Sequence, residues 1–253
     1  MNVICDIDGV IYRGDRLLPG SDLALQRLRD AGVTVHYATN NSTKSAQTVS
    51  ERLTRITGVE VTPGAIVTSS QAAIHLLGEA PGLVMVLGSE GIISALADAG
   101  IGLTEDPLAA QALLVGLDFE LSYDRLTRAA DAVRFGARFI ATNTDPTYPI
   151  ADGLLPGGGA MVAAVQVATG VEPEVAGKPH PPMRALLRAK GIGAAWVIGD
   201  RVDTDIALAE SEPDWTSILV LTGVTGPGET GDADHVVPDL AAAVDLVLAA
   251  PDR

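Results

Sequence analysis

Short apolar runs alternate with helical patterns along most of the chain, and this alternation is the feature that most constrains the fold. All of the runs except the one at residues 33–38, which contains Thr34 and His36, are apolar throughout, and this is typical of strands buried on both faces. The runs lie at residues 3–5, 33–38, 65–67, 83–87, 113–115, 139–141, 196–198 and 218–221. Amphipathic helical patterns separate most of them, including one that follows Pro19 and Gly20 and one at residues 240–248. The pattern predicts an α/β fold with a doubly wound parallel sheet covered by helices on both faces.

Two loops divide this pattern into parts. The first loop, at residues 79–82, contains Pro81 and Gly82, and the second lies at residues 170–173. The segment between them has strand and helix patterns of its own and is long enough for a small domain. We therefore predict a core formed by residues 1–79 and 175–253, with a smaller α/β domain inserted at residues 80–174.

The composition argues against several classes of protein. Thirty-two acidic residues against 17 basic ones give a net charge of −15, which disfavours binding to nucleic-acid polymers or anionic membrane surfaces. The single cysteine, Cys5, rules out an intramolecular disulfide and a cysteine-rich zinc site. The chain opens on a strand without a basic segment, and no stretch approaches the roughly 18 apolar residues of a membrane span. We therefore expect a cytoplasmic protein with no membrane partner.

An aspartate pair follows the first predicted strand. Asp6 and Asp8 are two residues apart, so their side chains leave the strand on the same side, and Gly9 permits a tight turn. Ligands of open α/β sheets bind at the carboxyl ends of the strands. Two carboxylates about 4 Å apart repel by about 4 kcal/mol at an effective dielectric constant near 20, unless a cation or a shared proton relieves them. The pair therefore indicates a cation site or proton transfer; the alternative is a surface turn capped by an aspartate.

A second acidic cluster, at residues 199–205, follows the strand at residues 196–198. Asp200 lies at the strand end, where no helix-capping role is open to it. Asp203 or Thr204 is a natural N-cap for a helix that we expect to begin here. Because these oxygen ligands come without a histidine or cysteine pattern, they favour Mg²⁺.

Two further elements carry groups that suit an anion. Thr39-Asn40-Asn41 ends the second predicted strand and offers a hydroxyl, two amides and backbone N–H groups at the expected start of a helix, which is a typical anion site. Gly177-Lys178-Pro179 places a lysine beside a glycine that allows close approach of the backbone. Each element alone is more often structural, as an Asn-rich turn or a solvated lysine.

The order of these elements resembles that of the haloacid dehalogenase-like superfamily of phosphohydrolases, and in particular its NagD-type subfamily. The resemblance covers nearly the whole chain. It is carried by Asp6-Ile-Asp-Gly-Val-Ile-Tyr-Arg-Gly, Thr39-Asn-Asn-Ser-Thr-Lys, Gly116-Leu-Asp118, Thr142-Asn-Thr-Asp145, Pro156-Gly-Gly-Gly159, Gly177-Lys-Pro and Gly199-Asp-Arg-Val-Asp-Thr-Asp205. The segment at residues 210–215 departs from it, because the family usually has a short glycine-containing loop there. The resemblance implies a Rossmann-like core with an inserted α/β cap domain, and a Mg²⁺-dependent phosphatase.

The resemblance also implies roles for the acidic residues. Asp6 would be the nucleophile that forms an aspartyl-phosphate, and Asp8 would be the general acid and base. Asp6, the carbonyl oxygen of Asp8 and Asp200 would hold Mg²⁺. Asp205 would orient Asp200 or a water bound to the metal.

The remaining implied residues contact the substrate. The residues expected to bind the phosphate are Thr39, Asn40, Asn41 and Lys178, and Lys178 would also neutralise the nucleophile. The cap would close over the site and exclude water, and the residues expected to face the leaving group are Asp118, Asn143, Asp145 and Tyr148. The segment Pro156-Gly-Gly-Gly159 opens a helix. Its backbone approaches the substrate, or, as the alternative, the segment is only a turn.

Several questions stay open at the level of the sequence. The expected substrate is a small phosphate ester: a sugar phosphate, glycerol phosphate, a nucleotide or an aryl phosphate. A phosphotransferase or mutase would use the same residues with a second substrate in place of water. A non-enzymatic phosphoacceptor switch also combines Asp, Thr and Lys around Mg²⁺, although Asp8 and the inserted segment count against it. Caps of this type often pair, so the resemblance allows a homodimer.

Overall fold

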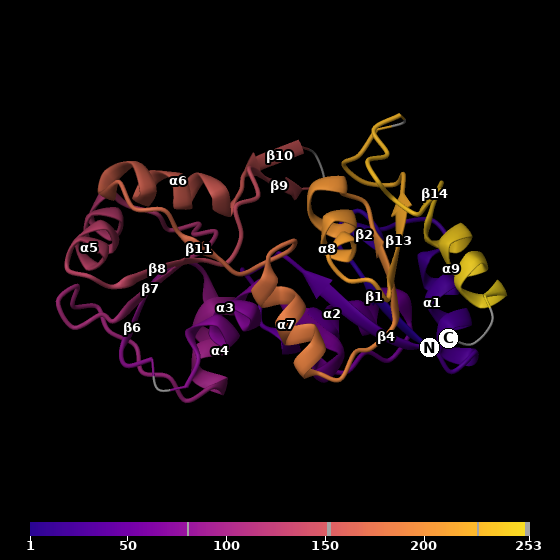
Figure 1. The fold of residues 1–253 in the computed structure, drawn as a ribbon, viewed down its shortest axis with the longest axis horizontal. Helices are drawn as coiled ribbons and strands as arrows, with labels where there is room; N and C mark the ends of the chain where they lie inside the picture. The colour runs from indigo at the N-terminus through magenta and orange to yellow at the C-terminus, as the bar shows by residue number, and fades with distance from the viewer. Residues whose placement is uncertain (80, 151–152, 227, 251–253) are drawn as a thin grey trace.

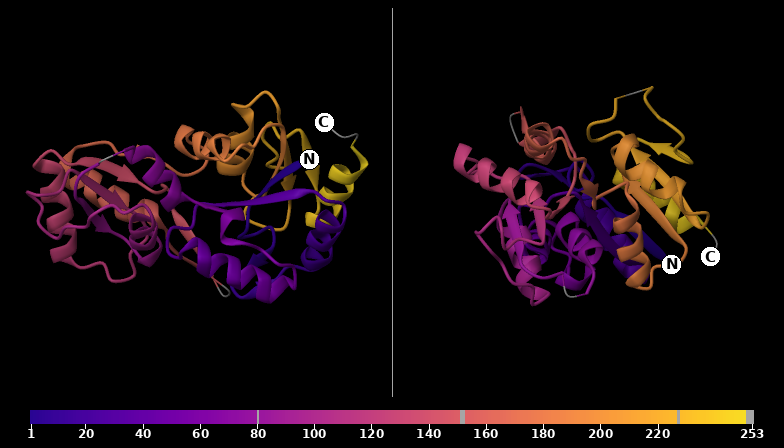
Figure 2. Two further views of the ribbon diagram at one scale, coloured as in Figure 1. Left: turned by 90° about the horizontal axis from the view of Figure 1, so that it is seen from below. Right: turned by 60° about the vertical axis from the view of Figure 1, so that its left-hand side comes forward.

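The computed structural model describes residues 1–79, 81–150, 153–226 and 228–250, and its two largest sheets lie at opposite ends of an elongated molecule (Figures 1 and 2). The larger sheet has six parallel strands. Their order across the sheet is β14 (His235–Val237), β13 (Trp215–Val220), β12 (Ala195–Gly199), β1 (Asn2–Cys5), β4 (Thr34–Thr39) and β5 (Ile66–Thr68). The predicted fold class is confirmed.

Alternate residues of the buried strands pack on opposite faces of this sheet. Val3 and Cys5 of β1 contact one apolar cluster, to which α1 (Ser21–Asp30), α2 (Ala46–Thr57) and α9 (Leu240–Ala249) contribute. Ile4, between them, belongs to the cluster on the other face, with α3 (Ser69–Leu77), α7 (Pro181–Ala189) and α8 (Ala207–Glu210). Both faces are therefore covered by helices, which explains why these strands are rich in apolar residues.

The second sheet is also parallel and has the order β11 (Glu174–Val175), β8 (Arg138–Ala141), β7 (Ala112–Val115) and β6 (Val84–Leu87). The helices α5 (Tyr123–Arg134) and α6 (Gly158–Thr169) pack on one face, where Leu113 and Val115 point. Leu114 points to the other face and shares a single apolar cluster with α3 and with α4 (Glu90–Asp98). The same cluster contains Ile4, so the apolar packing is continuous from one sheet to the other.

Local sequence signals set several helix ends. The α2 helix begins after Ser45, whose hydroxyl oxygen accepts a hydrogen bond of 3.1 Å from the backbone N–H of Thr48. The α3 helix begins with a reciprocal capping box between Thr68 and Gln71. Two one-turn elements complete the helical segments, η1 (Pro63–Ala65) and the π-helical turn η2 (Val202–Ile206). Among the helices of the described residues, each is too short or too polar to cross a membrane.

Two short hairpins have no counterpart among the predicted strands. The first joins β2 (Tyr12–Arg13) to β3 (Arg16–Leu17), directly after the aspartate pair. The second joins β9 (Thr147–Ile150) to β10 (Gly153–Pro156) and leads into α6. Residues of the β9–β10 hairpin line the cavity described next, whereas the β2–β3 hairpin is linked to it by a β-bridge between Tyr12 and Asp8.

Candidate active site

The carboxyl ends of three neighbouring strands meet at the candidate site. In the six-stranded sheet β1 lies between β12 and β4, so Asp6 and Asp8 follow the central strand, Asp200 follows one neighbour and Thr39 ends the other. All four residues line one cavity. Residues of the second sheet's loops, between residues 143 and 158, line the same cavity from the opposite side. The sequence therefore brings these groups together through strand order, as expected for an open α/β sheet.

Lys178 is the buried cation of the cavity. Its side chain is 3% exposed, and its Nζ lies 2.5 Å from Asp6 Oδ1 and 2.7 Å from Asp205 Oδ1. The third donor of the ammonium group reaches the carbonyl oxygen of Ala38, at 2.8 Å. Burial lowers the pKa of Lys178, but the two carboxylates raise it by more, so the lysine stays charged.

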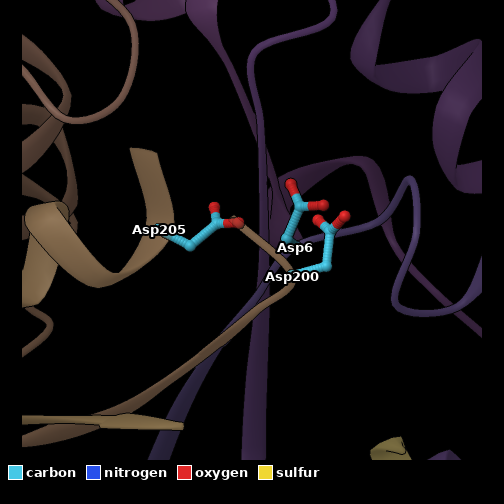
Figure 3. A group of neighbouring side chains, drawn as sticks. All are labelled: Asp6, Asp200 and Asp205. Atoms are coloured by element: carbon cyan, nitrogen blue, oxygen red, sulfur yellow. The ribbon is translucent and has the colours of Figure 1, made fainter. Parts of the chain in front are cut away.

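Three carboxylates crowd together beside this lysine. Oxygens of Asp6, Asp200 and Asp205 all lie within 4.8 Å of one another. Figure 3 shows Asp6 and Asp200 side by side at the ends of their strands, with Asp205 pointing toward them from the neighbouring helical turn. Asp200 Oδ2 accepts a hydrogen bond of 2.7 Å from the backbone N–H of Val224, whereas the buried Oδ1 has no partner among the described residues.

Burial disfavours the charged forms of two carboxyl groups in this cluster, those of Asp6 and Asp200. Burial, and then the nearby charge of Asp205, raise the pKa of Asp200 to about 7. Burial is also the largest cause that raises the pKa of Asp6, against the lowering effect of Lys178. A divalent cation would give the unpaired buried oxygen a partner, and its charge would favour the ionised form of the carboxylates. Because all the ligands are carboxylate oxygens, the site fits Mg²⁺.

Asp8 lies apart from the three clustered carboxylates and lines the same cavity. Burial raises its pKa to about 6, although Arg52 and Lys178 lower it in part. A carboxyl group with this pKa can hold a proton and also give it up near neutral pH, as an acid and base requires.

The loop after β4 presents polar groups to the cavity. Thr39 Oγ1 accepts a hydrogen bond of 3.0 Å from the backbone N–H of Asn41, which leaves the hydroxyl proton of Thr39 free to donate. The side-chain oxygen of Asn41 accepts from the backbone N–H and the hydroxyl of Thr43. The expectation that a helix starts at this segment is wrong, because α2 begins only at Ala46. The loop turns for several residues first, and Ser45 caps the helix.

Asn40 joins three segments that are far apart in the sequence. Its Nδ2 donates to Asp145 Oδ1 and to the carbonyl oxygen of Lys178, both at 3.1 Å. Its Oδ1 accepts from the backbone N–H of Lys178 at 2.8 Å, and its carbonyl oxygen accepts from Asn143 Nδ2 at 2.7 Å. The side chain of Asn40 is therefore committed to holding Lys178 and the second sheet's loop in place.

The residues expected to face the leaving group divide into two sets. Asn143, Asp145 and Tyr148 line the cavity. Asp118 is not among the residues that line it, so the structure gives its expected contact with the leaving group no support. Its Oδ2 instead forms an ion pair of 2.7 Å with Arg125 of α5, and its Oδ1 accepts from the backbone N–H of Glu120. Asp118 therefore stabilises the loop that follows β7.

The segment after β12 also differs in part from the prediction. The helical turn η2 begins at Val202, with Arg201 preceding it, and neither Asp203 nor Thr204 makes a capping hydrogen bond. Asp203 instead pairs with Arg201, in two hydrogen bonds of 2.7 and 3.0 Å. Asp205 Oδ2 accepts from the backbone N–H of Arg201 at 3.2 Å, so it fixes the turn as well as contacting Lys178.

Glycines make room for the acidic cluster. A Cβ atom at Gly223 would lie 1.7 Å from Asp200 Oδ2, and a Cβ atom at Gly199 would lie 2.1 Å from the Cβ of Asp205. Gly9, at a φ of 89°, approaches Asp200 closely as well. The backbone therefore packs directly against the carboxylates, and larger residues at these positions would displace them.

Sequence reasoning missed several residues that line the cavity: Ser42, Thr43, Leu117, Thr147, Pro149, Leu154, Arg201, Thr204 and Val224. Arg201 and the residues of the 39–43 loop lie inside motifs that were already singled out, so their position in the motif was a usable signal. Pro149 and Leu154 come from the β9–β10 hairpin, which has no strong pattern in the sequence.

Comparisons with known proteins agree with this geometry. Residues 3–102 match the haloacid dehalogenase-like hydrolase family, and residues 175–243 match a second model described as HAD-hydrolase-like. An acid sugar phosphatase of Staphylococcus aureus is 37% identical over 227 residues, which cover 88% of this chain and 86% of that protein. The D-glycerol 3-phosphate phosphatase of Mycobacterium tuberculosis is 38% identical, over 92% of this chain. This chain spans only 66% of that relative's length.

Solved structures show the same similarity. The p-nitrophenyl phosphatase from Archaeoglobus fulgidus superposes with a TM-score of 0.88 and 34% identity, over 97% of this chain and 98% of that one. The glycerol phosphate phosphatase from Mycobacterium tuberculosis, in complex with magnesium, superposes with a TM-score of 0.87 and 34% identity, over 99% of this chain and 79% of that one. The resemblance inferred from the motifs is confirmed: the chain belongs to the haloacid dehalogenase-like hydrolase family, in its NagD-type group of phosphatases.

Proposed function

We propose that this chain is a Mg²⁺-dependent phosphomonoester hydrolase that acts on a small phosphorylated metabolite through an aspartyl-phosphate on Asp6. One observation carries the proposal: Asp6 lies in hydrogen-bond contact with Lys178 and within 4.8 Å of two further carboxylates, at the base of a cavity. The names of the relatives, which are phosphatases of glycerol phosphate, sugars and nitrophenyl phosphate, support the same class of reaction.

In the first half of the reaction a carboxylate oxygen of Asp6 attacks phosphorus, and the bond from phosphorus to the leaving oxygen breaks. Asp8 donates its proton to that oxygen, so that an alcohol leaves. In the second half Asp8 takes a proton from water as the water attacks the phosphorus of the aspartyl-phosphate, which releases inorganic phosphate and restores Asp6. The pKa of about 6 for Asp8 suits both steps.

The positive charge for this chemistry comes from two sources. Asp6 and Asp200 would hold Mg²⁺ with the carbonyl oxygen of Asp8, and the bound ion would offset the charge of the phosphate and its transition state. Lys178 lies beside Asp6, where it lowers the repulsion between the nucleophile and the incoming phosphate. Asp205 holds Lys178 and the turn after β12, and through them it keeps Asp200 in position.

The phosphate oxygens would be bound by the loop after β4. Its groups are the hydroxyl of Thr39, the backbone N–H of Asn40 and the side-chain amide of Asn41. Asn143, Asp145 and Tyr148 would face the leaving group. In this proposal residues 80–174 act as a cap over the core of residues 1–79 and 175–253, and the cap excludes water from the first step.

The expected partner is a small phosphate ester, and the net charge of −15 disfavours a nucleic-acid polymer. We expect the protein in the cytoplasm. Formation of a homodimer, which the family resemblance allows, can be tested by sedimentation velocity.

A phosphate-release assay over a panel of phosphorylated metabolites, with Mg²⁺ or with EDTA, tests the proposed function. We expect release of inorganic phosphate from at least one ester with Mg²⁺, and none in EDTA or in Asp6→Asn. Turnover that persists in Asp6→Asn would refute the assignment of the nucleophile. Transfer of the phosphoryl group to a second metabolite would favour a transferase, and a phosphorylated Asp6 that lasts for minutes would favour a phosphoacceptor switch.

A further inference from the structure

The charge of the cavity lining is strongly negative. Among the described residues, the acidic ones that line it are Asp6, Asp8, Asp145, Asp200 and Asp205, and the basic ones are Lys178 and Arg201. With Asp8 protonated, as its role as the acid requires, four carboxylates face two cations and leave two negative charges unbalanced. A divalent cation would offset these two, while the phosphate of a bound ester would itself add about two. The cavity with its phosphate bound therefore carries excess negative charge, to which a second anionic group of the substrate would add.

Both cations of the cavity are already paired. Lys178 uses its three donors on Asp6, Asp205 and the carbonyl oxygen of Ala38. Its charge therefore acts mainly on Asp6 and Asp205, at the end of the cavity that holds the proposed nucleophile. Arg201 is engaged by Asp203 through two hydrogen bonds, and its charge also acts on Asp145. Each cation therefore already has an acidic partner, which weakens its attraction for a second anionic group of the substrate.

Asp145 adds negative charge on the side of the second sheet. Its Oδ1 accepts from Asn40, and its Oδ2 accepts no hydrogen bond within the described parts of the chain. A carboxylate oxygen with an unfilled position can accept from a substrate hydroxyl, but it repels a carboxylate or a second phosphate.

The rest of this side of the cavity combines aliphatic and aromatic side chains with a few polar groups. Leu117, Tyr148, Pro149 and Leu154 line it, with Thr147, the backbone of Gly157 and Gly158, and Asn143, whose Nδ2 already donates to Asn40. Phe119 packs edge-on against Tyr148, with ring centroids 6.0 Å apart, and so supports this wall. Apolar surface stabilises an uncharged group and offers no hydrogen bond to an anion that has lost its water.

We propose that the cavity selects phosphate monoesters whose leaving group is uncharged, and that Asp145 rejects esters with a second anionic group. The inference rests on the proposed function and adds the substrate class to it. Neutral polyols, sugars and phenols are accepted as leaving groups. Bisphosphates and phosphates of hydroxy acids are discriminated against.

A matched pair of substrates tests this directly. Glycerol 3-phosphate and 3-phosphoglycerate have the same carbon skeleton and differ at one end, where a hydroxymethyl group replaces a carboxylate. With Mg²⁺ present, we expect kcat/KM to be about tenfold or more higher for glycerol 3-phosphate, and the ratio to fall as added salt screens the charges. Glucitol 6-phosphate and 6-phosphogluconate form a second pair with the same contrast, at C1.

The variant Asp145→Asn keeps an oxygen for the hydrogen bond from Asn40 and removes the negative charge. We expect the ratio of kcat/KM for glycerol 3-phosphate to that for 3-phosphoglycerate to fall at least about threefold in this variant, mainly because kcat/KM for the anionic ester rises. Asp98→Asn is the matched control, because it makes the same change of charge at an exposed position on α4 and should leave the ratio unchanged.

Equal kcat/KM for the two esters, a preference for the anionic one, or an unchanged ratio in Asp145→Asn would overturn this inference while leaving the phosphatase intact. Absence of hydrolysis of all four esters and of p-nitrophenyl phosphate would instead overturn the proposed function, and this inference with it.

Discussion

At the scale of single residues, the site depends on a buried cation that balances buried acids. Removing one member of such a group leaves the others uncompensated, which costs about 3–5 kcal/mol in typical buried pairs. Lys178 contacts two carboxylates with almost no solvent exposure. Its charge therefore contributes to the folded structure as well as to the proposed reaction.

We predict that Lys178→Met lowers the free energy of unfolding by about 3–5 kcal/mol in EDTA, because Asp6 and Asp205 then face each other without their cation. Urea denaturation monitored by fluorescence measures this change. The exposed Lys190 provides a control, since Lys190→Met should change the free energy by less than about 0.5 kcal/mol. Equal stability of the two variants would mean that the buried acids are protonated and need no cation.

The buried carboxyl of Asp8 leads to a second prediction at this scale. Asp8→Asn removes the proposed acid and base, so hydrolysis of an alkyl phosphate should slow by about 10²–10⁴-fold. The first step needs little protonation when the leaving group is p-nitrophenolate. That ester should therefore still phosphorylate Asp6, and the aspartyl-phosphate should accumulate because no base activates water.

Mass spectrometry of the intact variant, mixed with p-nitrophenyl phosphate and Mg²⁺, detects the phosphorylated species. Asp98→Asn should turn over normally under the same conditions. An unphosphorylated Asp8→Asn protein that still hydrolyses alkyl phosphates at the normal rate would contradict the role of Asp8.

Much of the site was predictable at the scale of residues because its members end predicted strands. Asp6, Asp8, Thr39 and Asp200 follow apolar runs, and strand order brings them together. The ion pair between Asp118 and Arg125 was not predictable, because Arg125 comes from a helix whose orientation cannot be read from the sequence. The hydrogen bonds of Asn40 to Asp145, Asn143 and Lys178 also join segments that are distant in the sequence, and no local pattern predicts them.

At the scale of elements, the loops that follow β12 and β13 position the acidic cluster through close backbone packing. Asp200 lies against Gly223, and the neighbouring N–H of Val224 donates to it. The loop therefore fixes one carboxylate oxygen and leaves the other, the buried Oδ1, without a hydrogen-bond partner among the described residues.

We predict that Gly223→Ala weakens the response to Mg²⁺, because the new methyl group would occupy the place of Asp200 Oδ2. The concentration of Mg²⁺ that gives half-maximal activity should rise about tenfold or more, as expected when one charged ligand is displaced. Gly226→Ala is a control on the same loop, where no atom lies within 4 Å of the added Cβ. Identical Mg²⁺ titrations for both variants would contradict this account of Asp200.

The elements themselves were predictable to different degrees. The longer strands and the helices α1 and α9 carry clear apolar patterns, and the structure places them at the expected residues. The hairpins β2–β3 and β9–β10 have strands of only two to four residues, and β9 contains Pro149. Such short segments lack enough period-two alternation to be recognised. They matter here because one of them forms the wall of the cavity.

At the scale of the whole molecule, one apolar cluster joins the two large sheets. Leu96 of α4 and Leu114 of β7 share it with Ile4 of the six-stranded sheet and with α3 between them. The two parts of the chain therefore bury apolar surface against each other, and they should lose it together on unfolding.

We predict that the protein unfolds in a single transition and that Leu96→Ala lowers the stability of both large sheets together. The substitution should lower the free energy of unfolding by about 2–5 kcal/mol, because it opens a cavity in a fully buried cluster. Both tryptophans, Trp196 and Trp215, lie in the six-stranded sheet, so their fluorescence reports on the part that does not contain Leu96.

Fluorescence and far-ultraviolet circular dichroism should give the same urea midpoint in Leu96→Ala, shifted by the same amount from the wild type. The exposed Ile93 on the same helix supplies the control, since Ile93→Ala should have a small effect. A tryptophan transition that does not move, beside an earlier transition in circular dichroism, would show that the two sheets unfold independently.

The central claim is that Asp6, Asp200 and Lys178 surround one divalent ion and the phosphate bound to it. A crystal structure with Mn²⁺ in place of Mg²⁺ and with inorganic phosphate tests it most directly, because anomalous scattering locates the manganese. We predict one strong anomalous peak in contact with carboxylate oxygens of Asp6 and Asp200, with phosphate beside it and within hydrogen-bond reach of Lys178 and Thr39. A manganese peak that contacts neither aspartate, or phosphate bound away from Lys178, would contradict the account.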